Sequence, residues 1–220
     1  MPQISAIEPQ KRKKDRLNIY IDGQFGFGID VASAKQQKLE VGQNLTGEKL
    51  NEIILESQVG KLLDKVYRFL SYRGRSEKEI KNYLKEKIAK ESGLKFREIS
   101  DNTPVLKAVL KKLKKMNLVN DVEFAKNWKD SRTKYDSKSE RVVRGELFKK
   151  GIDKELIETL FEEEPINELK LAQKALQKRI SRFEKLPPKE KKQKIFRYLA
   201  SKGFNFDTIS SVIDTYLKRE

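Results

Sequence analysis

The stretch Leu147-Phe-Lys-Lys-Gly-Ile152 returns later in the chain as Leu199-Ala-Ser-Lys-Gly-Phe204, with the leucine, one lysine and the glycine in the same places. The match continues without a gap, because Ile157 and Ile209 hold equivalent positions downstream. A glycine directly after a lysine-containing turn is a common end of an α-helix. Internal repetition of this kind predicts one supersecondary unit that is stacked several times to share a core.

An earlier copy of the unit begins at Arg75-Ser-Glu77. In it, Ile80 and Leu84 take the positions that Val143 and Leu147 hold in the second copy. From about residue 60 onward, apolar residues recur at helical spacing, with breaks near glycine or proline. The pattern predicts nine helices in three repeats. We expect capping boxes at Ser76–Glu79 and Ser137–Glu140, and a helix N-cap at Asp153. Chains built in this way usually present an extended surface to a large partner.

The residues before the repeats predict a different structure. Alternating apolar and polar residues flank Asp22-Gly23, which is a strong signal for a β-hairpin over about Arg16–Ile29. We also expect a short strand at Ile4–Ile7 and helices near residues 31–38 and 46–57, the second of them capped by Thr46. The fold class is therefore mainly α, with three tandem three-helix repeats in an elongated array after a small α+β N-terminal domain. The expected domains are residues 1–58, 59–118, 119–164 and 165–220.

The composition excludes several kinds of chemistry. The 220 residues include no cysteine and no histidine, so disulfides, thiolate nucleophiles, histidine-based triads and the usual zinc sites are ruled out. No apolar run approaches the length of a membrane span, and no signal-peptide core stands at the N-terminus. We expect a cytoplasmic protein that is not an enzyme and that holds no cofactor and no metal.

The net charge of +16 is distributed in blocks. Residues 1–58 carry eight basic and eight acidic side chains, and residues 119–164 carry ten and twelve. Residues 59–118 carry 17 basic against seven acidic side chains, and residues 165–220 carry 14 against six. The first and third repeats are therefore strongly basic, while the second is close to neutral. Such blocks suggest a phosphate backbone or an acidic filament as the partner.

Each of the two basic repeats carries a row of cations on one predicted helix face. The rows are Lys107, Lys111, Lys114 and Lys115 in the first repeat, and Lys170, Lys174, Lys178 and Arg182 on a helix expected over about residues 166–183 in the third. Like charges at this spacing repel one another, so helix stability does not explain them. One interpretation is a merely solvated face. The occurrence of a row in both basic repeats favours a role in binding.

Two further groups are candidates for binding. Arg73 and Arg75 stand at a predicted turn directly before a helix N-terminus, where they can clamp a phosphate or a carboxylate. An ordinary glycine-containing helix end explains them equally well. Tyr20, Phe25 and Phe27 of the hairpin could stack on single-stranded nucleic acid. For Phe25 and Phe27 we favour packing against the helices of residues 31–57.

Several motifs, taken in order and spacing, resemble the signatures of the RecX family. They are Arg68-Phe-Leu-Ser-Tyr-Arg-Gly-Arg-Ser-Glu-Lys-Glu-Ile80, Asn120-Asp-Val-Glu-Phe-Ala-Lys-Asn-Trp128, Leu147-Phe-Lys-Lys-Gly-Ile152 and Lys202-Gly-Phe204. The resemblance covers residues 60–220. The segments Ile7-Glu-Pro-Gln10 and Asp22-Gly-Gln-Phe-Gly-Phe27 are similar to a β extension found in some members. Asn120 departs from the aspartate pair usual in the family, but asparagine caps a helix equally well.

The resemblance implies a regulator, typically an inhibitor, of the RecA recombinase. Such proteins bind the RecA–DNA filament along its groove and modulate strand exchange, ATP hydrolysis and coprotease activity in DNA repair and recombination. The resemblance supplies no catalytic residue. The expected partners are the RecA filament and single- or double-stranded DNA with little sequence preference, and we expect a monomer. Two alternatives stay open: a stand-alone DNA- or RNA-binding protein, and a protein-interaction scaffold that uses the acidic run Glu162-Glu-Glu164.

Overall fold

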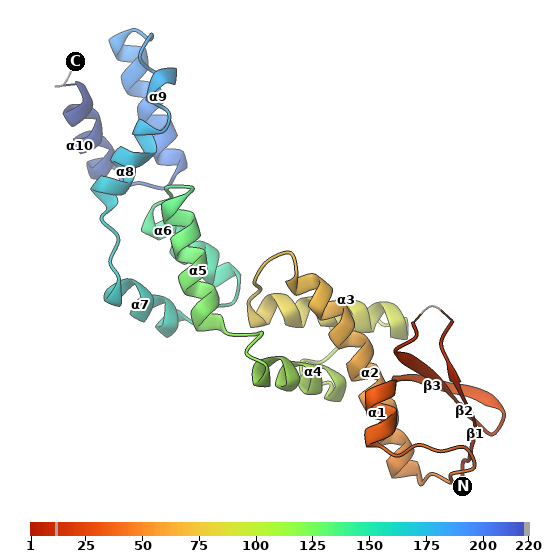
Figure 1. Ribbon diagram of the computed structural model, residues 1–220. Helices are drawn as coiled ribbons and strands as arrows, with labels where there is room; N and C mark the ends of the chain where they lie inside the picture. Colours follow the sequence, from red (N-terminus) through yellow and green to blue (C-terminus); the bar gives the residue numbers. More distant parts are fainter. Residues whose placement is uncertain (12, 218–220) are drawn as a thin grey trace. The chain divides into compact units, whose positions relative to one another are not determined.

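The computed structural model describes residues 1–11 and 13–217, and Figure 1 shows its helices and strands. Within these residues the chain forms ten α-helices, three β-strands and two short 3₁₀ turns. The chain divides into two compact units. The first contains Met1–Arg75 and Ile80–Val119, and the second contains Ser76–Glu79 and Asn120–Glu220. Residues 218–220 of the expected third repeat lie outside the described residues.

A three-stranded antiparallel sheet begins the first unit. Its strands are β1 (Ile4–Pro9), β2 (Arg16–Ile21) and β3 (Gln24–Asp30), in the order β1-β2-β3. The turn between β2 and β3 is Asp22-Gly23, with φ angles of 50° and 83°. Positive φ at both residues matches the twist of the flanking strands, which is why Asp-Gly favours this turn. The predicted hairpin and the predicted first strand are both confirmed.

Two helices follow the sheet, α1 (Val31–Gln36) and α2 (Gly47–Leu70). The expected helix at residues 46–57 does begin at the predicted cap, because Thr46 Oγ1 accepts a hydrogen bond from Lys49 N at 3.2 Å. Its predicted end is wrong, since α2 continues through Gly60 into the first three-helix repeat. Ser57 Oγ donates to the carbonyl oxygen of Gly28 at 2.5 Å, so contact with β3 stabilises α2 where the sequence suggested a break.

The first repeat combines the second half of α2 with α3 (Glu77–Ser92) and α4 (Pro104–Lys115), and the short turn η1 (Phe96–Glu98) lies between the last two. The Ser76–Glu79 capping box predicted for α3 is confirmed by hydrogen bonds in both directions, of 3.2 and 3.3 Å. Side chains from all three helices share one core. Its largest fully buried members include Ile80, Leu84, Leu106 and Leu113.

The second repeat consists of α5 (Asp121–Lys134), α6 (Glu140–Lys149) and α7 (Lys154–Glu163). The predicted N-cap of α7, Asp153, is confirmed by the hydrogen bond that its carboxylate accepts from Glu155 N at 2.8 Å. The third repeat consists of α8 (Glu168–Gln177), the turn η2 (Ile180–Arg182), α9 (Pro188–Ser201) and α10 (Phe206–Leu217). The nine helices expected after residue 60 are therefore present.

The repeats bury matching residues. Leu84, Leu147 and Leu199 each have no exposed surface, and each lies in the core of its own repeat. A fully buried leucine at the same place in three successive units is what a repeated supersecondary unit requires. The periodicity of the sequence therefore predicted both the helices and their inward faces.

The second unit contains two contacts between equivalent pairs of residues, made by a serine hydroxyl in one and by a serine amide in the other. Ser76 Oγ donates a hydrogen bond to the carbonyl oxygen of Lys150 at 2.7 Å. Ser139 N donates to the carbonyl oxygen of Lys202 at 3.0 Å. The two serines hold equivalent positions, at the N-termini of α3 and α6, and the two lysines hold equivalent positions at the C-terminal ends of α6 and α9. We call these contacts the first joint and the second joint.

A carboxylate strengthens each joint. Glu77 N donates to Asp121 Oδ1 at 2.8 Å in the first joint, and Glu140 N donates to Glu168 Oε1 at 2.5 Å in the second. The amides at a helix N-terminus lack partners within the helix, so a carboxyl oxygen from another element can accept their hydrogen bonds. Each joint therefore satisfies the start of one helix with groups from the following repeat.

Each joint contains a glycine at the point where the backbone comes closest to a side chain of the other helix. Gly151 and Gly203 have φ angles of 80° and 93°. A Cβ on Gly151 would lie 2.3 Å from Lys78 Cδ, and a Cβ on Gly203 would lie 2.2 Å from Val142 Cγ2. Both the left-handed backbone and the close approach exclude a larger residue. The glycines predicted as helix ends therefore also allow the close approach to Lys78 and Val142 at the two joints.

Candidate nucleic-acid interface

Helix α4 separates its apolar and charged residues onto two sides. Its buried side chains are Val105, Leu106, Val109, Leu110 and Leu113. The side chains of Lys107, Lys111, Lys114 and Lys115 are exposed, as is that of Lys112. The helix contains no acidic residue. The helix is therefore amphipathic, and its solvent-exposed side is uniformly positive.

The two arginines of the predicted clamp have different environments. Arg73 is exposed in the turn after α2, and its Nη1 donates to the carbonyl oxygen of Gly74 at 2.8 Å. The guanidinium of Arg75 lies 4.0 Å from the centre of the Phe69 ring. The Phe69 ring stacks in turn on Tyr83, with 4.2 Å between ring centres. Packing therefore holds Arg75 in place, while Arg73 extends from the turn.

The row of cations expected in the third repeat is not one helical face. Helix α8 ends at Gln177, six residues before the end expected from the sequence. Hydrogen bonds between residues three apart follow it, including Arg179 N to Leu176 O at 2.9 Å and Phe183 N to Ile180 O at 2.8 Å. Only Lys170 and Lys174 lie on the exposed side of α8, and Arg182 lies in the turn η2. The tight turns after α8 still place apolar residues at regular intervals. Lys178 and Arg182, however, no longer continue the face of α8 that carries Lys170 and Lys174.

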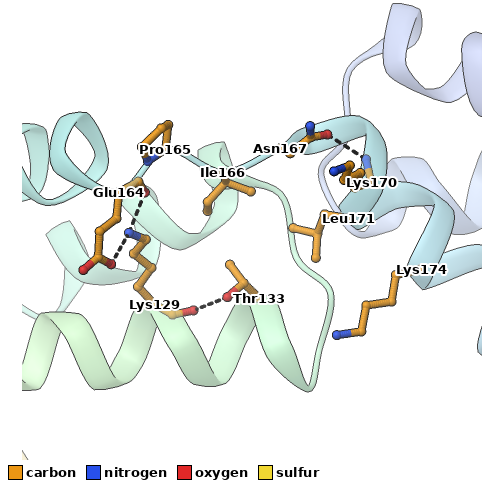
Figure 2. Close-up of a pocket in the computed structure, with 9 residues that line it drawn as sticks. All are labelled: Lys129, Thr133, Glu164, Pro165, Ile166, Asn167, Lys170, Leu171 and Lys174. Atoms are coloured by element: carbon orange, nitrogen blue, oxygen red, sulfur yellow. Dashed lines mark hydrogen bonds and ion pairs between the residues drawn. The ribbon is translucent and has the colours of Figure 1, made fainter.

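Lys170 and Lys174 line a surface pocket of about 370 Å³ (Figure 2). In the same pocket, the Lys129 ammonium donates to the backbone oxygen of Glu164 at 2.6 Å and to its carboxylate at 3.0 Å. Figure 2 shows Lys129 directed at Glu164. The hydrogen bond from Lys129 lowers the pKa of Glu164. Lys129 is almost fully buried and neutralised, so the positive charge of this pocket comes from the other two lysines.

Lys178 has a structural role that its position in the sequence did not indicate. Its ammonium donates to the carbonyl oxygens of Lys134 and Tyr135, at 3.3 and 2.8 Å, and to Ser137 Oγ at 3.3 Å. Lys202 donates to the next carbonyl oxygen of the same loop, that of Asp136, at 2.8 Å. Two ammonium groups from the third repeat therefore bind the loop between α5 and α6.

The loop between α5 and α6 is surrounded by cations that come from outside the loop as well as from within it. Burial lowers the pKa of Lys202, and the charges of Arg179, Lys138 and Lys178 lower it further, against the opposing effect of Asp136. The pKa of a lysine falls in this way when like charges are close. Sequence reasoning missed Lys138, Arg179 and Lys202. These three residues are far apart in the sequence, and no local pattern indicates that they lie near the second joint.

A carboxylate in the second repeat organises the residues around Trp128. Glu146 accepts hydrogen bonds from Trp128 Nε1 at 2.9 Å, from Arg132 Nε at 2.9 Å and from Lys138 Nζ at 2.5 Å. The cationic groups of Arg132 and Lys150 each lie 4.1 Å from the Trp128 ring centre. Burial raises the pKa of Glu146, but these hydrogen bonds and the charge of Lys138 outweigh burial, so the pKa is lowered.

The hairpin aromatics differ from one another. Phe27 is buried in the core shared with α1 and α2, as expected. The expectation for Phe25 is wrong, because its side chain is 57% exposed and contacts the Tyr20 ring edge-on at 6.1 Å. Phe25 is close in sequence to the Asp22-Gly23 turn, near the start of β3. A capping serine was also misassigned, since Ser139 rather than Ser137 caps α6.

Residues 1–11 and 13–217 contain neither a cluster of side chains suited to a metal ion nor a membrane-spanning helix. No group of three or more acidic, cysteine or histidine side chains is placed to hold a metal ion. No helix in this part of the chain is long and apolar enough to cross a membrane.

A small domain with a β-hairpin, followed by three three-helix repeats, defines a helical-repeat protein. Four family models match the chain: the regulatory protein RecX N-terminal domain at residues 2–46, and the first, second and third RecX three-helix domains at residues 63–91, 120–160 and 167–213. The chain belongs to the RecX family of regulatory proteins.

Curated relatives and solved structures agree. A regulatory protein RecX of Listeria welshimeri is 34% identical over 92% of this chain and 71% of the relative. The regulatory protein RecX of Bacillus subtilis is 33% identical over 97% of this chain and 77% of the relative. A crystal structure of a regulatory protein RecX matches with a TM-score of 0.64 and 27% identity, over 97% of this chain and all of that one. RecX from Lactobacillus salivarius shares the fold, with a TM-score of 0.53, 23% identity and coverage of 72% of this chain and 96% of that one.

Proposed function

We propose that this protein binds the RecA–DNA filament and inhibits strand exchange, ATP hydrolysis and coprotease activity. Its membership in a family of regulatory proteins supports a regulatory role. The uniformly positive face of α4 is the observation that carries the proposal to a DNA-containing partner. Lysines along a helix neutralise phosphates without reading bases, so binding depends on backbone charge and shows little sequence preference.

The proposed regulation acts through differential binding. A ligand shifts an equilibrium between two filament states only as far as it binds one state better than the other. The basic first and third repeats hold the phosphate backbone, and the nearly neutral second repeat contacts protein. In this proposal the chain binds as a monomer and acts without cofactor or metal. Regulation results from binding alone and involves no catalytic step by this protein.

The test measures RecA-catalysed strand exchange with and without substoichiometric amounts of the full-length protein. We expect strand exchange and single-strand-dependent ATP hydrolysis to fall together. Unchanged rates at a one-to-one ratio to RecA would refute the proposal. An increase in the rates would refute inhibition and leave a regulator of opposite sign.

The rival function is that of a stand-alone DNA- or RNA-binding protein, which the lysines of α4 also suit. Binding to the filament and to the same DNA without RecA separates the two. We expect tighter binding to the filament. Equal or tighter binding to bare nucleic acid, with a preference for particular sequences, would favour the rival.

A further inference from the structure

Two exposed tyrosines hold equivalent positions in the first and second repeats. Tyr72 and Tyr135 are separated by the same offset as Leu84 and Leu147. Each stands in the loop between the first two helices of its repeat. Their exposed fractions are 83% and 69%. Residues at such exposure contribute little to the free energy of folding, so packing does not explain a large aromatic side chain at both places.

The Tyr72 loop is positive. Arg73 follows directly and is exposed, and the guanidinium of Arg75 lies on the face of Phe69 nearby in the chain. Arg68 is exposed one turn earlier on α2. Residues 68–75 contain no acidic side chain. An aromatic ring that solvent can reach is therefore surrounded in sequence by three arginines.

The Tyr135 loop is positive for a different reason. The Lys134 ammonium lies 5.7 Å from the centre of the Tyr135 ring. Lys178 donates to the Tyr135 carbonyl oxygen at 2.8 Å, and Lys202 donates to the Asp136 carbonyl oxygen. The Asp136 carboxylate is engaged by Arg132 at 2.6 Å. The ammonium groups at this loop therefore bind neutral carbonyls, and much of their charge remains available to an anion.

We propose that the Tyr72 and Tyr135 loops are base-stacking sites for single-stranded nucleic acid. Each ring stacks on an unpaired base, and the neighbouring cations bind the adjoining phosphates. Exposed aromatic rings beside cations are the arrangement by which proteins bind single strands without reading their sequence. The inference rests on the proposed binding of a DNA-containing filament and deepens it, because it assigns the contact to unpaired bases as well as to backbone charge.

Charge favours nucleic acid over a protein partner at these sites. A protein-binding patch is typically depleted of charged residues at its centre, with arginine the exception. Lysines gather at the Tyr135 loop, and three arginines stand close in sequence to Tyr72 without an acidic residue among them. Phe25 is a useful contrast, because it is comparably exposed but belongs to the charge-balanced N-terminal part.

The test compares two labelled strands of equal length, one of oligothymidylate and one of abasic units with the same phosphates. Fluorescence anisotropy with the full-length protein measures both affinities. We expect the wild type to bind oligothymidylate more tightly than the abasic strand by about fivefold or more. The double variant Tyr72→Ala/Tyr135→Ala should lose this preference and bind both strands as the wild type binds the abasic one. Its dependence on salt concentration should be unchanged, because no cation has been removed.

Three variants serve as controls. Tyr72→Phe/Tyr135→Phe should retain the preference, because phenylalanine keeps the ring. Tyr72→Leu/Tyr135→Leu should lose it, because leucine is apolar but cannot stack. Phe25→Ala should behave as the wild type. Unchanged circular dichroism and thermal unfolding would establish that every variant is folded.

Several outcomes would overturn the inference. They are a preference that persists in the double alanine variant, a loss that is equal on the abasic strand, or a loss that follows Phe25→Ala instead. A double variant that binds both strands normally but no longer inhibits RecA would assign the tyrosines to a protein contact. If the wild type inhibits RecA and binds DNA but has no base preference, this inference fails and the proposed function stands.

Discussion

The amide nitrogen of Ser139 donates a hydrogen bond to the carbonyl oxygen of Lys202 at 3.0 Å, in the same place where Ser76 Oγ donates to the carbonyl oxygen of Lys150 at 2.7 Å. The repetition therefore extends from the cores to the contacts between repeats. Buried leucines could recur in units that are merely similar. Matching joints show in addition that equivalent residues at the helix ends take the same partners, as expected of a repeated unit.

Leu147 should be essential to the second repeat. It has no exposed surface, so Leu147→Ala should lower the free energy of unfolding by about 2–5 kcal/mol through lost burial and an unfilled cavity. The neighbouring residue Phe148 is 66% exposed, and Phe148→Ala should change the same quantity by less than about 0.5 kcal/mol. Urea unfolding followed by circular dichroism measures both. Similar effects of the two substitutions would contradict the assignment of Leu147 to a core.

Gly203→Ala should destabilise the second joint. The substitution imposes a left-handed backbone on alanine, at about 1–2 kcal/mol, and also drives a methyl group into Val142. Gly42 is the matched control, because its φ is 88° and no heavy atom lies within 4 Å of the added Cβ. We expect Gly203→Ala to exceed Gly42→Ala by about 1–3 kcal/mol in urea unfolding. Equal losses of unfolding free energy in the two variants would mean that the second joint accommodates the added methyl group without strain.

Glu146 should make the stability of the second repeat depend on pH. Hydrogen bonds from Lys138 and Trp128 hold its folded pKa below the ordinary 4.5, despite burial. The ionised carboxylate therefore stabilises the fold above about pH 4.5, and this stabilisation is lost as the pH falls through the folded pKa. The difference in free energy of unfolding between wild type and Glu146→Gln should shrink between pH 7 and pH 3. A constant difference would be evidence against the network.

Glu168 supplies a control of opposite sign for the pH experiment. Burial raises its pKa, partly offset by the hydrogen bond from the Glu140 amide. Folding therefore favours its protonated form, and the stability of the wild type relative to Glu168→Gln should be greatest at low pH and fall as the pH rises through 4.5.

Reversing charge on α4 should weaken filament binding without unfolding the protein. Lys107→Glu, Lys111→Glu and Lys115→Glu together change exposed residues opposite the buried side of the helix. We expect weaker binding, loss of RecA inhibition and a logarithmic salt dependence shallower by about 2–3, since each lost phosphate contact contributes about 0.7–0.9. Lys14→Glu, Lys35→Glu and Lys38→Glu in the N-terminal part make the same charge change. Equal potency of the two triple variants would leave α4 as a solvated face.

The third repeat needs a separate version of that experiment. Lys170→Glu with Lys174→Glu tests the pocket-lining cations of α8, which are exposed. Lys178 should be left unchanged, because its ammonium binds the α5–α6 loop. Lys178→Glu is expected to lower the melting temperature, which Lys170→Glu with Lys174→Glu should not do.

Local chemistry explains what the sequence predicted well. The Asp22-Gly23 turn, the Ser76–Glu79 capping box and the periodic leucines each depend on residues close together in the chain. Such signals do not need tertiary context, because backbone preference and helix geometry act over a few residues.

The errors arose where tertiary contacts override local preference. Ser57 and Gly60 look like helix breakers, but Ser57 bonds to β3 and a Cβ at Gly60 would lie 3.4 Å from Asp30 Oδ2. The hydrogen bond from Ser57 to β3 therefore stabilises the helix where local preference favours a break. Apolar periodicity also failed to reveal that α8 ends at Gln177, since the 3₁₀ turn after it keeps Phe183 in the core. The cations of Lys178 and Arg182 were misplaced for the same reason.

The candidate site was predictable only in part. Exposed lysines on α4 follow directly from the spacing of Val105, Leu106 and Val109. The tyrosines emerge only when the repeats are aligned and their exposure is known. The charge at the Tyr135 loop comes from Lys178 and Lys202, which lie far away in sequence. No local pattern could indicate it.

Each joint combines a serine at the start of a helix in one repeat with a glycine turn in the next repeat. The third repeat lacks the serine, and the first repeat lacks the glycine. In the third repeat the position equivalent to Ser139 is Lys191, which is buried and so cannot receive another glycine turn. In the first repeat the position equivalent to Gly151 is Ile88, in the middle of α3. Head-to-tail contacts polymerise when both halves remain accessible at the ends. The third repeat therefore has no serine to receive a further glycine turn, and the first repeat has no glycine turn to supply one.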